Sequence, residues 1–90
     1  MNKDIPFKNR DRLIQLGIAI GALRKLRGLS QEMLAEKAGV SRSLISSIEA
    51  SGIAKSFSLD VFFSIADALE IDPADLLKTS VFPDTVFKDQ

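Results

Sequence analysis

Residues 29–49 read LSQEMLAEKAGVSRSLISSIE, and this stretch decides the fold. Ser30 and Ser41 each precede a short run with helical spacing, and serine is a favoured N-cap because its hydroxyl accepts a hydrogen bond from a free main-chain N–H. Gly39 lies between the two runs, where a residue without a Cβ can take the left-handed conformation that ends a helix. The stretch therefore predicts two short capped helices joined by a tight turn.

The apolar residues of this stretch lie three and four positions apart, so each predicted helix has one inward face. The inward set is Leu34, Ala35, Ala38, Val40, Leu44, Ile45 and Ile48. The outward face of the second helix carries Arg42, Ser43, Ser46 and Ser47. Two helices packed in this way form a helix-turn-helix, which places its second helix in the major groove of DNA. The alternative from spacing alone is an ordinary helical hairpin.

The flanking sequence predicts three more helices. Residues 11–27 carry an apolar stripe of Leu13, Leu16, Ile20 and Leu23, and Gly28 ends the run. Ser58 caps a helix running to about Leu69, with an expected inward face of Leu59, Phe62, Ile65, Ala66 and Leu69. Asp72 and Pro73 begin a last helix, in which Leu76 and Leu77 are expected to close the core. The prediction is an all-α domain over residues 11–78, with an N-terminal extension at 1–10, a loop at 50–57 and a tail at 79–90.

This series of motifs resembles the phage repressor/Cro (Xre-type) helix-turn-helix family. Besides residues 29–49, the likeness includes LG and IGALR at 16–17 and 20–24, SLD and IADAL at 58–60 and 65–69, and DPADLL at 72–77. The resemblance implies a compact five-helix, lambda-repressor-like domain that binds double-stranded DNA and regulates transcription. Controller proteins of restriction–modification systems are a specific relative, because they consist of little beyond this domain.

The resemblance also suggests which residues contact DNA. Gln31 opens the helix that crosses the backbone, where its amide can bond a phosphate. Arg42 can fork onto guanine, or it can take a phosphate from its place at the helix start. Serine hydroxyls discriminate weakly between bases, so DNA shape is expected to supplement the direct code. The remaining candidate contacts are Ser41, Ser43, Ser46, Ser47, Lys55 and Ser56.

Arg24 and Glu49 match positions that commonly form an ion pair in the family. Such a pair would tie the first helix to the recognition helix and fix the angle at which that helix is presented. The alternative is two independent solvated charges.

Two departures from the family pattern also stand out: Gly52 comes three residues after Glu49, one later than usual, and Glu70 replaces a frequent glycine. If the backbone at Glu70 is left-handed, it carries a strain of about 1–2 kcal/mol.

Composition argues against other function classes. The 90 residues include no histidine and no cysteine, which removes the commonest general base, metal ligands and any disulfide framework. No enzyme activity, metal, cofactor or small-molecule ligand is therefore expected. There is no apolar run near the length of a membrane span and no signal-peptide core, so a cytoplasmic protein is expected.

The formal net charge is zero, which weighs against DNA binding unless the charges are segregated. Residues 1–42 hold nine Lys and Arg against four Asp and Glu, whereas residues 43–90 hold three against eight. This distribution is compatible with a basic face at the helix-turn-helix end of the domain.

Apolar residues in excess of one core suggest a partner. They are Ile18, Ala19, Ala22, Leu26, Phe63, Val81, Phe82, Val86 and Phe87. We expect a homodimer, since two-fold dimers match palindromic half-sites. The alternative for the same faces is that the N-terminal segment and the tail fold back over them. The alternative function is a protein-interaction module, chiefly an antitoxin that neutralises a partner toxin.

Overall fold

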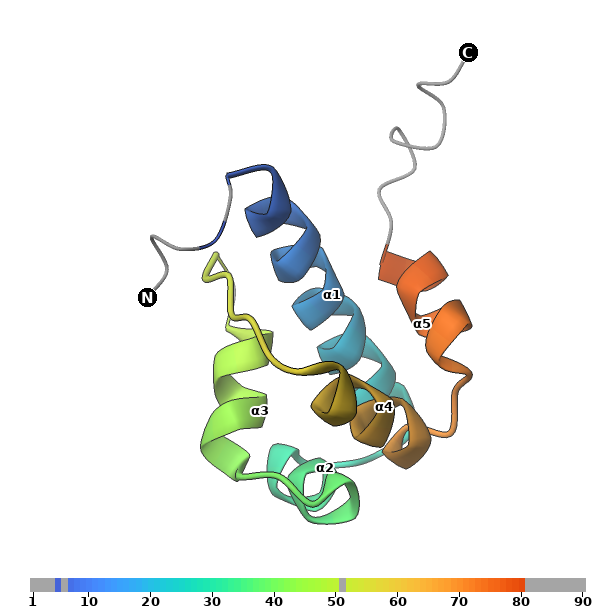
Figure 1. The fold of residues 1–90 in the computed structure, drawn as a ribbon. Coiled ribbons are helices and arrows are strands. Elements are labelled where there is room, and N and C mark those ends of the chain that lie inside the picture. Colours follow the sequence, from blue (N-terminus) through green and yellow to red (C-terminus); the bar gives the residue numbers. More distant parts are fainter. Residues whose placement is uncertain (1–4, 6, 51, 81–90) are drawn as a thin grey trace.

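The computed structural model describes residue 5, residues 7–50 and residues 52–80. In this part of the chain there are five helices and no strand: α1 (Phe7–Leu26), α2 (Gln31–Ala38), α3 (Arg42–Glu49), α4 (Leu59–Ala68) and α5 (Pro73–Ser80). Figure 1 shows α3 and α5 on opposite sides of α1, with α2 crossing below and α4 in front. The predicted all-α, five-helix architecture is confirmed.

Side-chain caps begin four of the helices where the sequence predicts them. The hydroxyls of Ser30, Ser41 and Ser58 accept hydrogen bonds from the main-chain N–H three residues later, at 3.0, 3.0 and 3.1 Å. Asp72 accepts from the N–H of Ala74 at 2.8 Å, directly ahead of Pro73. Each cap satisfies a donor that would otherwise lack a partner inside its helix.

The turn between α2 and α3 depends on Gly39, which has φ 71° and ψ 31°. In this left-handed conformation the chain reverses, and the N–H of Val40 bonds to the carbonyl of Ala35 at 3.0 Å. Two residues later Ser41 caps α3, so the connection is as tight as the sequence predicts.

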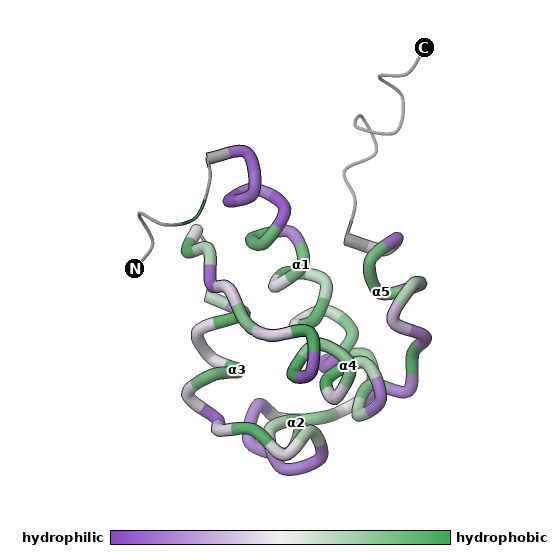
Figure 2. Tube along the Cα trace, viewed as in Figure 1, coloured by the Kyte–Doolittle hydropathy of each residue, from purple (hydrophilic) through white to green (hydrophobic). Residues whose placement is uncertain are grey.

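One apolar core lies where the five helices meet. Its buried members are Leu16, Ala19, Ile20, Leu34, Ala35, Ala38, Ile45, Ile48, Phe62, Ile65, Ala66, Leu69 and Leu76. Figure 2 shows hydrophobic residues along the middle of α1 and in α4, and hydrophilic residues on the first turns of α1 and the outer side of α2. No helix in the described ranges is long and apolar enough to cross a membrane.

Several details differ from the sequence prediction. α1 begins at Phe7, four residues before the predicted Asp11, and α5 continues to Ser80. Leu59 is not inward but 69% exposed, because it lies in the first turn of α4, beyond the residues of that helix that reach the core. Leu77 is half-exposed, since Leu76 alone takes the core position on α5. Ala19, expected on an outer face, is buried in the core.

Glu70 follows α4 with φ 60°. It is the one non-glycine residue with positive φ in the described part of the chain. The backbone at Glu70 is therefore left-handed, which is the condition under which the sequence predicts strain. Arg27 of the loop after α1 braces this end of α4, donating from Nε to the carbonyl of Leu69 at 2.7 Å. A cation placed on the terminal carbonyls of a helix also favours the helix dipole.

Candidate nucleic-acid interface

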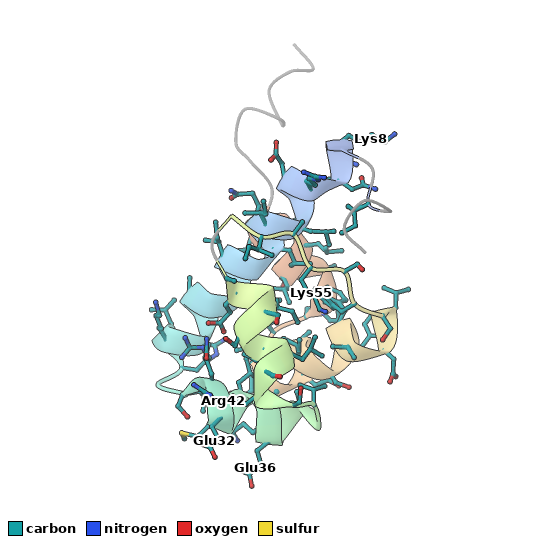
Figure 3. All side chains as sticks on the ribbon, turned by 90° about the vertical axis from the view of Figure 1, so that its left-hand side faces the viewer. Lys8, Glu32, Glu36, Arg42 and Lys55 are labelled. Atoms are coloured by element: carbon teal, nitrogen blue, oxygen red, sulfur yellow. The ribbon has the colours of Figure 1, made fainter. Side chains whose placement is uncertain are left out.

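α3 presents a polar face to solvent and an apolar face to the core. Ile45 and Ile48 are buried, while Arg42, Ser43 and Ser46 are exposed and Ser47 is half-buried. Figure 3 views this side of the molecule, with α3 in front, Arg42 at its lower end and Lys55 in the loop above. The structure thus brings the predicted outward residues of α3 onto one face, on which Ser47 is less exposed than the other three.

Ser41 has a structural role that limits its part in binding. Its hydroxyl oxygen accepts from the N–H of Leu44 at 3.0 Å and so caps α3. The hydroxyl hydrogen remains free to donate, and a phosphate oxygen can only accept. Ser41 is therefore suited to the DNA backbone rather than to reading base edges.

Glu49, the last residue of α3, is the centre of a hydrogen-bonded cluster. Arg24 of α1 donates to its carboxylate from Nε at 2.8 Å and from Nη2 at 2.9 Å. Gln31 of α2 donates from Nε2 to Glu49 Oε1 at 3.0 Å. Arg24 also donates from Nη1 to the carbonyl of Leu29 at 2.8 Å. One carboxylate therefore joins α1, α2 and α3.

This cluster is well shielded from water, with the side chains of Arg24 and Glu49 only 11% and 9% exposed. Hydrogen bonding to Glu49 raises the pKa of Arg24 above its usual value, burial opposes that shift, and charge attraction to the carboxylate adds to it. The guanidinium therefore stays charged, and its two parallel bonds to the carboxylate give the contact a fixed geometry.

Gln31 lies where the family resemblance puts it, at the start of α2, but its amide contacts Glu49. The bond uses one of the two amide hydrogens, so the second is available to a phosphate. Sequence reasoning missed the bond because Gln31 and Glu49 are 18 positions apart and meet only once the helices pack. Spacing along one helix carries no signal for such a contact.

An open depression of about 480 Å³ lies beside this cluster. It is lined by Arg24, Ser30, Gln31, Glu32 and Arg42. The N-terminus of α2 opens here, and free main-chain N–H groups and the helix dipole favour an anion at such a place. The depression therefore joins the start of α2 to the first residue of α3.

The charges around the helix-turn-helix are balanced rather than basic. Residues 30–58 contain the basic residues Lys37, Arg42 and Lys55 and the acidic residues Glu32, Glu36 and Glu49. Glu49 is neutralised by Arg24, whereas Glu32 and Glu36 are exposed on α2, below Arg42 in Figure 3. The excess of basic residues in the N-terminal half therefore does not make the surface of the helix-turn-helix basic.

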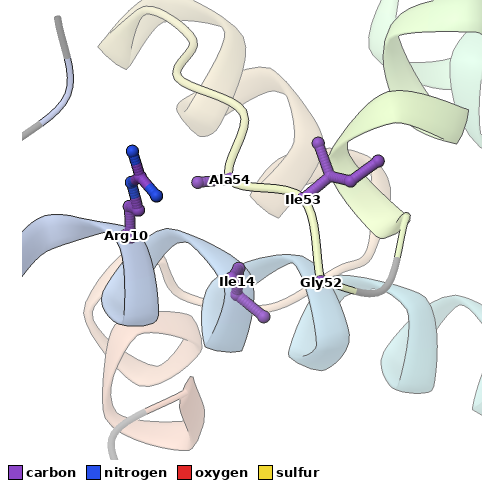
Figure 4. Close-up of a pocket in the computed structure, with 5 residues that line it drawn as sticks. All are labelled: Arg10, Ile14, Gly52, Ile53 and Ala54. Carbon is purple, nitrogen blue, oxygen red and sulfur yellow. The ribbon is translucent and has the colours of Figure 1, made fainter. Parts of the chain in front are cut away.

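A second, smaller cavity lies between α1 and the loop that follows α3. It has a volume of about 170 Å³ and is lined by Arg10, Ile14, Gly52, Ile53 and Ala54 (Figure 4). Gly52, which comes one residue later than is usual in the family, has φ 79°. None of the residues predicted to contact DNA lines this cavity.

Comparisons with known proteins agree with this geometry. Residues 20–76 match the helix-turn-helix family. The solved restriction-modification controller protein C.AhdI from Aeromonas hydrophila is 36% identical, with 71% of this chain and 94% of that chain covered and a TM-score of 0.66. A hypothetical transcription factor, NHTF, from Neisseria is 26% identical, with coverages of 89% and 84% and a TM-score of 0.69. The comparison with curated proteins finds no match.

Proposed function

The chain belongs to the Xre-like helix-turn-helix family of DNA-binding transcription regulators, and from this premise we propose that it binds a palindromic operator as a homodimer. The observation that carries the proposal is the two-sided character of α3. Ile45 and Ile48 are buried, and the ends of the helix are fixed by Ser41 and Glu49. Arg42, Ser43 and Ser46 are exposed on the other side.

In the proposed complex α3 lies in the major groove. Arg42 is the one residue on its outer face that can fork onto guanine O6 and N7, while Ser43 and Ser46 make less selective contacts. Gln31 and the N-terminus of α2 hold a phosphate on one side, and Lys55 holds one on the other. With so few direct readers, the affinity for one operator depends on DNA shape and on two correctly spaced copies.

Exposed apolar side chains outside this face support the homodimer. Leu26 of α1 is 77% exposed, and Ile18, Phe63 and Leu77 are each about half-exposed. Val81, Phe82, Val86 and Phe87 fall outside the described residues. Two copies related by a two-fold axis would place their α3 helices about 34 Å apart on DNA. Sedimentation at micromolar concentration should give twice the 9.8 kDa chain mass, and a single species of that mass would contradict the dimer.

The experiment that tests the function is selection of bound duplexes from random DNA, repeated at several salt concentrations. We expect enrichment of an inverted repeat, which gives the operator and the half-site spacing together. We also expect log K to fall linearly with log salt, with a slope that reports the number of phosphate contacts. No enrichment together with no salt dependence would reject DNA binding.

Replacing Arg42 distinguishes base reading from a phosphate contact. If Arg42 reads guanine, Arg42→Ala lowers affinity for the selected operator by about 1–3 kcal/mol and relaxes preference at one base pair. Arg42→Lys is the matched control, because lysine keeps the charge but loses the planar fork. Retained base preference in the alanine variant, with affinity lowered equally for all duplexes, would assign Arg42 to a phosphate. Unchanged binding in both variants, measured by fluorescence anisotropy, would exclude it from the interface.

A further inference from the structure

α1 carries two glycines, Gly17 and Gly21, on the side that meets the recognition helix α3. Both are buried and both lie in the interior of a 20-residue helix. Glycine weakens a helix interior relative to alanine, because it has more backbone freedom to lose. Close packing explains two glycines one turn apart in such a helix. The residues packed against them belong to the last turn of α3.

At Gly17 the neighbour is main chain. A Cβ at this position would overlap the carbonyl oxygen of Ile48 and lie 3.1 Å from its carbonyl carbon. Neither atom can move unless α3 itself moves, since both belong to the helix backbone. At Gly21 the neighbour is a side chain, because a Cβ there would lie 3.2 Å from Glu49 Cδ and Oε1. Gly17 thus makes room for the backbone of the last turn of α3, and Gly21 makes room for the carboxylate of the same turn.

We propose that Gly17 and Gly21 are positioning residues for DNA recognition, and that they set how far α3 stands out from α1. This inference rests on the proposed function. Gly17 fixes the separation of the two helix backbones, and Gly21 leaves room for Glu49 to receive its bonds from Arg24 and Gln31. Because Gln31 begins α2, the same carboxylate aligns the start of α2 with α3.

This arrangement predicts a particular defect. A side chain at position 17 pushes the last turn of α3 away from α1. Because α2 packs against α4 as well as against α3, it cannot follow α3 freely, and the bond from Gln31 to Glu49 is strained. The base-reading residues of α3 then move relative to the phosphate contact at the start of α2. The two sets of contacts can no longer be made together on one duplex, so specific binding suffers more than binding through phosphates alone.

The test compares Gly17→Ala with the native 90-residue chain on two duplexes, the operator obtained by selection and a scrambled duplex of the same length. Both proteins are assayed at a temperature where circular dichroism finds them fully folded. We expect affinity for the operator to fall about tenfold, within the range for one mismatched base pair. Affinity for the scrambled duplex and the salt slope should stay unchanged. An unchanged ratio of the two affinities would overturn the proposal.

Gln15→Gly is the matched control, because it weakens the same helix at an uncharged, half-buried position on the opposite side of α1 from Gly17. It should lower the melting temperature and leave the operator-to-scrambled ratio intact. A lowered ratio in this control would mean that loss of α1 stability alone explains the Gly17 result, which would overturn the positioning role.

If Gly17→Ala does not fold, Gly21→Ala provides the test. Its new methyl group contacts the side chain of Glu49, which can shift, so this variant is expected to fold. We expect a smaller loss of the same ratio, and an unchanged ratio in Gly21→Ala would reject the proposal in that case. Failure of the proposed function is a separate outcome, because the native chain would then show no selected operator at all.

Discussion

At the scale of single residues, the geometry of the interface depends most on Glu49. Burying a carboxylate and a guanidinium together has a desolvation cost comparable to the attraction gained, so the pair adds little net stability. What it adds is direction, because Glu49 takes bonds from two different helices. The cost of losing one partner is much larger than the net value of the pair.

Arg24→Ala should therefore lower the free energy of unfolding by about 3–5 kcal/mol, because it leaves Glu49 buried without its counter-charge. Urea denaturation measures this directly. The double variant Arg24→Ala/Glu49→Ala should recover part of the loss, since no isolated charge remains. An Arg24→Ala protein with an unchanged melting temperature would show that the pair has no structural weight.

Glu70 offers a change in the opposite direction. A left-handed residue with a Cβ is strained by about 1–2 kcal/mol, and glycine relieves this while losing about 0.5–1 kcal/mol to backbone entropy. Glu70→Gly should raise the free energy of unfolding by up to about 1.5 kcal/mol. Calorimetry should find a higher melting temperature. Glu36→Gly, at an exposed right-handed position in α2, is the control and should lower it. A lower melting temperature in both variants would contradict the strain at Glu70.

At the scale of elements, short helices depend on their ends. α2 and α3 have eight residues each, too few to be stable alone, so caps and packing decide whether they form. Ser41 is the clearest case, because it marks the point where the turn ends and the recognition helix starts.

Ser41→Ala should lower the free energy of unfolding by about 1 kcal/mol, the usual loss for a removed N-cap. Ser43→Ala is the control two residues away, since no hydrogen bond of its hydroxyl is found among the described residues. Its effect should stay within about 0.5 kcal/mol. Equal melting temperatures for the two variants, measured by thermal denaturation, would exclude a capping role for Ser41.

The sequence predicts which helices form better than it predicts where they begin and which of their end residues are buried. Caps, the glycine turn and the buried stripe of α3 follow from local rules, and the structure has them. Leu59 shows the limit, because helical spacing identifies a face but not how far the neighbouring helices extend along it. Phe7 shows another, since Asp11 is a plausible helix start and nothing local requires one turn more.

For the interface, the outward face of α3 follows from spacing alone, but the contact between Gln31 and Glu49 does not. It needs the crossing angle of two helices, which only the packed core determines. Gly17 is intermediate, because a glycine inside a strong helical pattern signals a close approach without naming the partner. The partner, Ile48, becomes evident once α1 and α3 are placed.

At the scale of the whole molecule, net neutrality limits non-specific binding. Residues 30–58 hold three exposed cations, of which Arg42 and Lys55 are the candidate phosphate neutralisers in each copy. A dimer would then neutralise about four phosphates, and log K against log salt should have a slope of about −4 or shallower.

Lys55→Ala should weaken binding about equally for all duplexes and reduce the slope by about one for each copy. The measurement is a salt titration of operator and scrambled DNA by fluorescence anisotropy. Lys37→Ala, on the far end of α2 from its N-terminus, serves as the control and should leave the slope unchanged. If Lys55→Ala changes preference among operators at constant slope, the lysine reads bases instead.

The division of α3 into an anchored inner side and an exposed outer side has an evolutionary consequence. Arg42, Ser43 and Ser46 contact solvent rather than the core, so they can be exchanged at little cost to folding. A duplicated gene could therefore acquire a new operator through a few surface changes while keeping Glu49, Gly17 and the caps intact. The same division makes the domain a practical scaffold, in which a library at three positions samples new targets without redesigning the core.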